Sequence, residues 1–228
     1  MQPFFNKELE NFRTNLVLMG ELAMENVRRA IKSLIDKDPD LADEALAKDD
    51  QIDRLEVAID QEAVRYISLR APVATDLRLI AIGMKASHDI ERIGDEASAI
   101  AKRAKKLALQ MPVKNYLDIP QMTALVLEML RDSIDSFIHG DEKKAHTIFE
   151  RDKTVNALNL KITNELKESI MENPAIAYQG IELMFVSKSL ERIGDHAKNI
   201  AEDVIYLLSG EDLRHSDKTK ARSDPDKP

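Results

Sequence analysis

The amino-acid sequence contains one five-residue block twice, and this repetition limits the folds open to the chain more than any other feature. The block Glu-Arg-Ile-Gly-Asp occupies residues 91–95 and recurs at residues 191–195, an offset of 100. Upstream of the block the offset is 103, which pairs Asp49 with Asp152. Loops tolerate insertions and deletions, so a three-residue difference in one loop explains the change of offset. The chain is therefore predicted to be a duplication.

Apolar residues recur at steps of three and four positions in every long segment. The longest stripes cover residues 82–107 and 183–207, and this spacing is typical of an amphipathic helix. No segment alternates between apolar and polar residues over any length. Aromatic residues make up only 4% of the chain, so its core must consist mainly of aliphatic side chains, which suits helices packed side by side. The predicted fold class is all-α, with six long helices, three in each half.

Prolines and one glycine divide the chain into these helices, because proline disrupts the interior of a helix. The boundaries are Pro39, Pro72, the Pro112/Pro120 pair, Gly140 and Pro174. The predicted helices span residues 4–36, 41–69, 75–109, 120–139, 141–171 and 175–209. We assign residues 1–110 to the first repeat and residues 118–210 to the second. Residues 211–228 are polar and charged, and we expect them to form a disordered tail.

Composition excludes several classes of protein. The formal net charge is −8, which disfavours a nucleic-acid partner. The basic cluster Lys102–Lys106 is interpreted as the cation-rich end of a helix. Cysteine is absent, so neither disulfides nor thiolate metal ligands can form. No stretch approaches the roughly 18 to 20 apolar residues of a membrane span, and the N-terminus does not resemble a signal peptide. We therefore expect a cytoplasmic protein without a membrane span.

Acidic pairs at a spacing of four residues are the candidate site. Residues i and i+4 of a helix lie about 40° apart and share a face. Both members of a pair lie roughly 160° from the centre of their own apolar stripe, so we expect them on the outer surface. A second pair lies on the preceding helix, which short connections make an antiparallel neighbour. The candidate metal ligands of the two halves are Asp49, Asp53, Glu91 and Asp95, and Asp152, Asn156, Glu191 and Asp195.

Two interpretations of these pairs remain open. Four carboxylates on one patch would favour a hard or borderline cation such as iron, manganese, magnesium, zinc or calcium. Alternatively, the pairs are ordinary solvated faces, which are common when 32% of residues are charged. Asn156 replaces a carboxylate in the second half, so we expect weaker binding or a different stoichiometry there. His88 lies one helical turn before Glu91 and is a candidate outer ligand.

Other motifs are uninformative or absent. Gly94 and Gly194 each lie in the middle of a predicted helix, where glycine destabilises the helix by about 1 kcal/mol relative to alanine. We attribute both glycines to the close approach of a neighbouring helix. There is no glycine-rich phosphate loop, no His-Glu-x-x-His and no visible pairing of a nucleophile with a base. The sequence therefore does not indicate an enzyme.

Two segments resemble a known family. Residues 89–95 with their repeat, and residues 71–78 (Ala-Pro-Val-Ala-Thr-Asp-Leu-Arg), are similar to the PhoU family. The latter segment also has a local interpretation, in which Thr75 caps a helix and Asp76 complements its dipole. The resemblance implies two pseudo-symmetric three-helix bundles, often dimeric, that bind metal through E(D)-x-x-x-D motifs. In this chain those motifs are the eight candidate ligands above.

The resemblance also implies a function. Proteins of the PhoU family are negative regulators of the phosphate-starvation response and of phosphate uptake. They act as adaptors between the ATPase subunit of the phosphate ABC transporter and a membrane histidine sensor kinase. The expected protein is thus a regulator with metal-binding surface motifs. The alternatives are a helical bundle whose acidic faces dock basic partners without metal, and, more remotely, a metal-dependent hydrolase.

Overall fold

Six long α-helices and one short 3-10 helix make up the computed structural model, which describes residues 3–110 and 118–210. The predicted tail, residues 211–228, lies outside the described residues. The helices of the first half are α1 (Pro3–Asp36), α2 (Pro39–Arg70) and α3 (Ala74–Ala108). Those of the second half are α4 (Ile119–His139), α5 (Glu142–Glu172) and α6 (Ala177–Ser209), with the 3-10 helix η1 (Pro174–Ile176) before α6. No strand occurs among the described residues, and the predicted all-α fold is confirmed.

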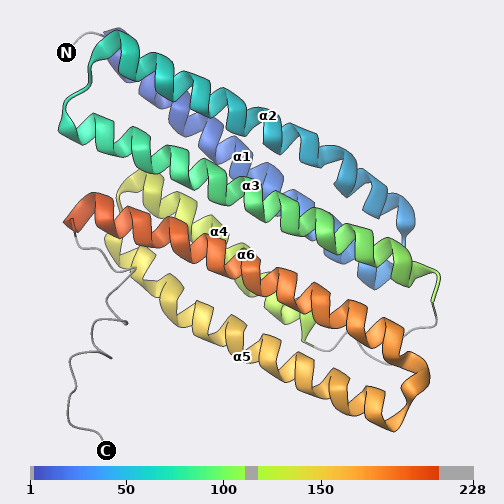
Figure 1. Ribbon diagram of the computed structural model, residues 1–228. Coiled ribbons are helices and arrows are strands. Elements are labelled where there is room, and N and C mark those ends of the chain that lie inside the picture. Colours follow the sequence, from blue (N-terminus) through green and yellow to red (C-terminus); the bar gives the residue numbers. More distant parts are fainter. Residues whose placement is uncertain (1–2, 111–117, 211–228) are drawn as a thin grey trace, which may run out of the picture.

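The two halves lie side by side as two three-helix bundles (Figure 1). Helix α3 packs on α6 and α1 packs on α4, so these four helices join the halves. Helices α3 and α6 run antiparallel. Arg103, near the end of α3, pairs with Glu182 near the start of α6, and Lys85, early in α3, pairs with Asp203 late in α6. None of the described helices is both long enough and apolar enough to cross a bilayer.

Helix boundaries follow from local signals in the sequence. The carboxylate of Asp38 accepts hydrogen bonds from two backbone amides at the start of α2, as an N-cap does. Gly140 ends α4 with φ 66°, a left-handed conformation that glycine adopts without the penalty of a Cβ. The prediction that Thr75 caps α3 is wrong. The helix already begins at Ala74, its N-cap is Val73, and no side chain caps it. Asp76 does lie in the first turn, as expected.

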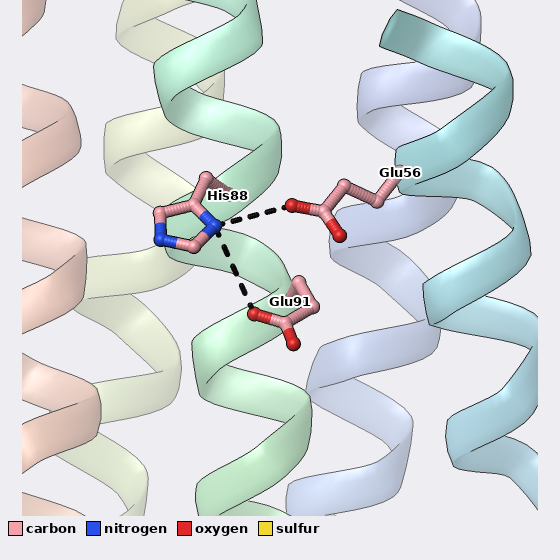
Figure 2. Close-up of side chains that lie close together, drawn as sticks. All are labelled: Glu56, His88 and Glu91. Atoms are coloured by element: carbon pink, nitrogen blue, oxygen red, sulfur yellow. Dashed lines mark hydrogen bonds and ion pairs between the residues drawn. The ribbon is translucent and has the colours of Figure 1, made fainter.

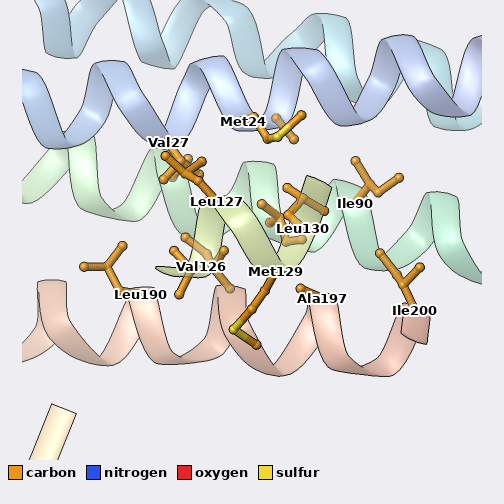
Figure 3. Close-up of a cluster of buried hydrophobic side chains, with 14 of the residues drawn as sticks. Met24, Val27, Ile90, Val126, Leu127, Met129, Leu130, Leu190, Ala197 and Ile200 are labelled. Atoms are coloured by element: carbon orange, nitrogen blue, oxygen red, sulfur yellow. The ribbon is translucent and has the colours of Figure 1, made fainter. Parts of the chain in front are cut away.

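The core is continuous between the halves. Buried aliphatic side chains of α1, α3, α4 and α6 meet where the two bundles join (Figure 3). On this shared surface α1 contributes Met24 and Val27, α4 contributes Met129 and Leu130, and α6 contributes Leu190. The apolar stripes of the two halves are therefore buried partly within each bundle and partly against the other bundle. This arrangement holds α2 and α5 at the outer sides, where each forms a seam with its neighbour α3 or α6.

Candidate metal centre

The seam between α2 and α3 contains one close cluster of ligand-type side chains (Figure 2). Glu56 extends from α2, while His88 and Glu91 extend from α3. His88 Nδ1 lies 3.1 Å from Glu56 Oε1 and 4.0 Å from Glu91 Oε2. One ligand atom from each of the three residues lies within 4.8 Å of the others. In the described part of the chain, no other group of three or more His, Asp or Glu side chains meets that condition.

The expectation that both members of each acidic pair face outward is wrong for the glutamates. The side chains of Glu91 and Glu191 are only 17% and 14% exposed, whereas those of Asp95 and Asp195 are about half exposed. Helix α3 contacts α1, α2 and α6, so three neighbours cover most of its circumference. A side chain opposite the centre of the apolar stripe therefore faces a seam between helices rather than open solvent.

Asp49 lies farther along the same seam and bridges α2 and α3. Its Oδ2 accepts a hydrogen bond of 2.7 Å from Ser98 Oγ. Gly94 makes room for it, because a Cβ at Gly94 would lie 3.0 Å from Asp49 Oδ1. The predicted close approach is therefore confirmed at Gly94. At Gly194 a Cβ would meet only ordinary contacts of 3.4 Å or more, and the explanation does not apply there.

Burial and like charge both disfavour ionisation in this seam. Burial raises the pKa of Asp49, and the neighbouring Asp53 and Asp95 raise it further, although the Ser98 hydrogen bond opposes the shift. Burial likewise raises the pKa of Glu91, and Asp95 adds to the effect. Glu91 Oε2 is buried without a hydrogen-bond partner, and its nearest cation is Arg92, at 3.3 Å. The seam therefore holds carboxylates whose charge the protein compensates only in part.

These pKa shifts predict a pH dependence for the metal-free protein. A carboxyl whose pKa is raised by folding stabilises the fold while protonated, and that contribution is lost as the pH rises through the folded pKa. We therefore expect Asp49→Asn to gain stability relative to wild type between about pH 4 and about pH 7. Urea unfolding of both proteins in EDTA at the two pH values measures this difference. A difference that stays constant with pH, or shrinks as the pH rises, would contradict the account.

The corresponding seam of the second half, between α5 and α6, contains lysines. Lys198 Nζ donates to Asp152 Oδ2 at 2.9 Å and lies 3.5 Å from Asp195 Oδ1. Burial opposes the charge of Lys198, but its pKa is nevertheless raised, because the carboxylates of Asp152 and Asp195 accept hydrogen bonds from the ammonium group and attract its charge. Asn156 donates to the same Asp152 oxygen at 3.4 Å. Two predicted members of the second motif, Asp152 and Asp195, therefore contact one ammonium group.

The candidate ligands differ in how closely they assemble. In the described residues, no three of the predicted quartet Asp49, Asp53, Glu91 and Asp95 bring ligand atoms within 4.8 Å of one another. The charges of Asp53 and Asp95 both raise the pKa of Asp49, and the charge of Asp95 also raises that of Glu91. Metal binding by the eight predicted residues stays a prediction. Of the eight, Glu91 belongs to the close cluster, and His88, predicted as an outer ligand, lies in that cluster beside it.

Sequence reasoning overlooked Glu56. This residue follows Asp53 by three positions, one turn along the same helix, so its proximity to the acidic pair was available from the spacing. The cluster it completes offers two carboxylates and one imidazole, a donor set that suits borderline cations such as manganese, iron or zinc. The Oε2 atom of Glu91, buried and without a hydrogen bond, is consistent with such an ion. The residues of the first half thus fit a divalent metal.

Comparison with known proteins gives a consistent result. The family model of the PhoU domain matches residues 16–104 and again residues 119–204. A Pseudomonas aeruginosa protein named phosphate-specific transport system accessory protein PhoU homolog is 40% identical over 221 residues. That match covers 96% of this chain and 91% of the relative.

Solved structures agree in fold. The crystal structure of PhoU from Pseudomonas aeruginosa has a TM-score of 0.87 at 40% identity and covers 91% of this chain and all of that one. The phosphate transport system regulatory protein PhoU from Streptococcus pneumoniae has a TM-score of 0.84 at 28% identity, with coverage of 92% and 99%. Both matches extend over both halves of the chain.

Proposed function

Because the chain belongs to the PhoU family, we propose that it is the accessory protein of a phosphate-specific transport system and restrains phosphate uptake and the phosphate-starvation response. The names of its relatives support this role, since one is an accessory protein of that system and another a regulatory protein of it. One name describes an accessory role and the other a regulatory one, neither names a reaction, and we assign no enzymatic activity to the chain.

The proposed mode of action is that of an adaptor on the cytoplasmic side of the membrane. When phosphate is plentiful, the protein links the ATPase subunit of the phosphate ABC transporter to a membrane histidine sensor kinase and keeps the kinase inactive. A duplicated fold supports this arrangement, because it presents two related surfaces with different side chains. We also propose that the protein forms a homodimer, as family membership implies.

A divalent metal in the seam between α2 and α3 is part of the proposal. Glu56, His88 and Glu91 would hold it, with Asp49 and Asp95 adding negative charge nearby. When bound, the ion supplies positive charge and a cross-link between the two helices. The observation that supports it most strongly is the convergence of two carboxylates and an imidazole, in which one carboxylate oxygen, Glu91 Oε2, is buried without a hydrogen bond.

Deleting the gene tests the regulatory role. We expect the deletion strain to produce alkaline phosphatase constitutively at high external phosphate, because the kinase is no longer held inactive. A plasmid copy of the wild-type gene should restore repression, and the activity of alkaline phosphatase is the measurement. Normal repression in the deletion strain would contradict the proposed regulation.

A second candidate function rests on an acidic groove between the two halves. The groove measures about 860 Å³, and five carboxylates and one lysine are among its lining residues. The charged members are Glu56, Asp60, Lys85, Asp89, Glu202 and Asp203. Such a groove favours a basic segment of a partner protein, bound without metal. Partner binding that weakens strongly at high salt but persists in EDTA would favour this alternative, because salt screens exposed charges.

A further inference from the structure

We propose that two lysines of α6 replace the metal in the second half, so that the chain holds a divalent cation only in its first half. This inference rests on the metal site of the proposed function and assigns that site to one of two related seams. It concerns Lys188 and Lys198, which lie against the acidic residues of the seam between α5 and α6.

The two seams can be compared position by position through the offsets of the repeat. Three carboxylates are shared, since Asp49, Glu91 and Asp95 correspond to Asp152, Glu191 and Asp195. The remaining positions around them change in character. The changed pairs are Asp53 with Asn156, Glu56 with Asn159, His88 with Lys188, and Ser98 with Lys198. The first seam thus offers five carboxylates and an imidazole at these positions, and the second offers three carboxylates and two ammonium groups.

Lys198 occupies the place where a cation would neutralise the second seam. Its ammonium contacts Asp152 and Asp195, the counterparts of the two aspartates that influence each other in the first seam. Asp152 is 6% exposed, so its charge needs a partner within the protein. At the equivalent position of the first seam, Ser98 donates one neutral hydrogen bond to Asp49 and brings no charge.

Lys188 performs the same role for the glutamate. Its ammonium forms an ion pair with Glu191, three residues along α6, whereas the equivalent His88 lies between Glu56 and Glu91. The partner carboxylate across the seam is also missing, because Asn159 stands at the position of Glu56. Its side-chain oxygen accepts a hydrogen bond of 2.8 Å from Ser187 Oγ. A three-ligand cluster like that of the first half therefore cannot assemble in the second.

Electrostatics makes the ammonium groups and a metal ion mutually exclusive. A divalent ion between Asp152 and Asp195 would lie beside a positive charge that is itself only 25% exposed. Binding would have to expel Lys198 from its carboxylates or place two cations in contact. The second seam therefore keeps two ammonium groups permanently against its three carboxylates. In the first seam Arg92 pairs with Glu91 and Asp95, and a metal would have to supply the remaining positive charge.

Exchange of residues between the two seams tests the inference. One variant rebuilds the first seam in the second half by Asn156→Asp, Asn159→Glu, Lys188→His and Lys198→Ser. The converse variant carries His88→Lys and Ser98→Lys. We expect the first variant to bind about twice as much Mn²⁺ per chain as wild type, and the converse variant to lose nearly all of it. Elemental analysis after equilibrium dialysis against Mn²⁺ gives the content, and circular dichroism verifies that each variant is helical.

A melting experiment in EDTA tests the lysine without any metal. Lys198→Ser leaves Asp152 buried beside no cation, so we expect its Tm to fall by about 5 °C relative to wild type. Ser98→Ala, at the equivalent position, removes only a neutral partner and should lower the Tm less.

The two experiments separate failure of the inference from failure of the proposed function. An unchanged Tm for Lys198→Ser in EDTA would overturn the inference. The inference would also be overturned if the variant with the rebuilt second seam bound no more Mn²⁺ per chain than wild type. Absence of Mn²⁺ from the wild type, together with a lowered Tm for Lys198→Ser, would remove the first-half metal site from the proposed function while supporting the role of the lysine.

Discussion

Replacing both Glu91 and Asp95 with alanine is expected to remove nearly all bound divalent metal while the helical content stays intact. Glu91 supplies one of the three converging ligands, and Asp95 raises the pKa of both Glu91 and Asp49 by adding negative charge to the seam. Loss of a partner outside the ligand shell already lowers metal affinity about 10- to 100-fold. Loss of a ligand together with a nearby charge should therefore exceed about 100-fold.

The duplication provides a matched control for this experiment. Glu191 and Asp195 occupy equivalent positions on α6, and replacing both with alanine should leave the metal content unchanged, because lysines already neutralise that seam. Metal bound to each purified protein is measured by elemental analysis, and helical content by circular dichroism. Equal metal in wild type and in the Glu91/Asp95 variant would refute the assignment of the site.

Leu190→Ala is expected to lower the free energy of unfolding more than any other substitution proposed for this chain. The Leu190 side chain is fully buried on α6, within the core that both halves share (Figure 3). Truncating a buried leucine costs about 2–5 kcal/mol, because apolar surface is lost and a cavity remains. For a chain of this size each kcal/mol lowers the Tm by about 2–4 °C, so we expect a fall of about 4–20 °C.

Leu160→Ala is the control for that substitution. Leu160 lies on α5 and is 62% exposed, so its truncation should change the free energy of unfolding by less than about 0.5 kcal/mol. Because the core continues from one half to the other, Leu190→Ala should also shift a single cooperative transition rather than split it. Thermal unfolding followed by calorimetry checks both expectations. Equal Tm values for the two variants, or separate transitions for the two halves, would contradict the shared core.

The fold could be predicted from the sequence because the features that determine where a helix begins and ends lie within a few residues of its ends. Helical periodicity, the repeat and the positions of proline and glycine placed every helix boundary within two residues. The errors have a simple cause. The rule that proline separates helices misplaces Pro39, which lies in the first turn of α2, where its fixed φ suits a helix and its missing amide N–H is no loss. The prediction for Thr75 fails because α3 begins at Ala74, one residue earlier than expected, so Thr75 lies inside the helix.

The site was less predictable because it depends on how helices face one another. Spacing places Glu91 and Asp95 on one side of α3, but it does not determine which side chain of α2 lies opposite. Glu56 fills that position, and only the packing of α2 on α3 brings it to His88. The burial of Glu91 likewise depends on three helices surrounding α3. Lys188 and Lys198, by contrast, follow from aligning the two halves by their offset, a comparison that needs the sequence alone.

The central claim is that the seam between α2 and α3 binds a divalent metal and the equivalent seam between α5 and α6 does not. Crystals grown with Mn²⁺ and measured near its absorption edge test this claim most directly. We predict an anomalous difference peak beside Glu56, His88 and Glu91, and none between Asp152 and Asp195. A peak in the second seam, or the absence of one in the first, would contradict the account.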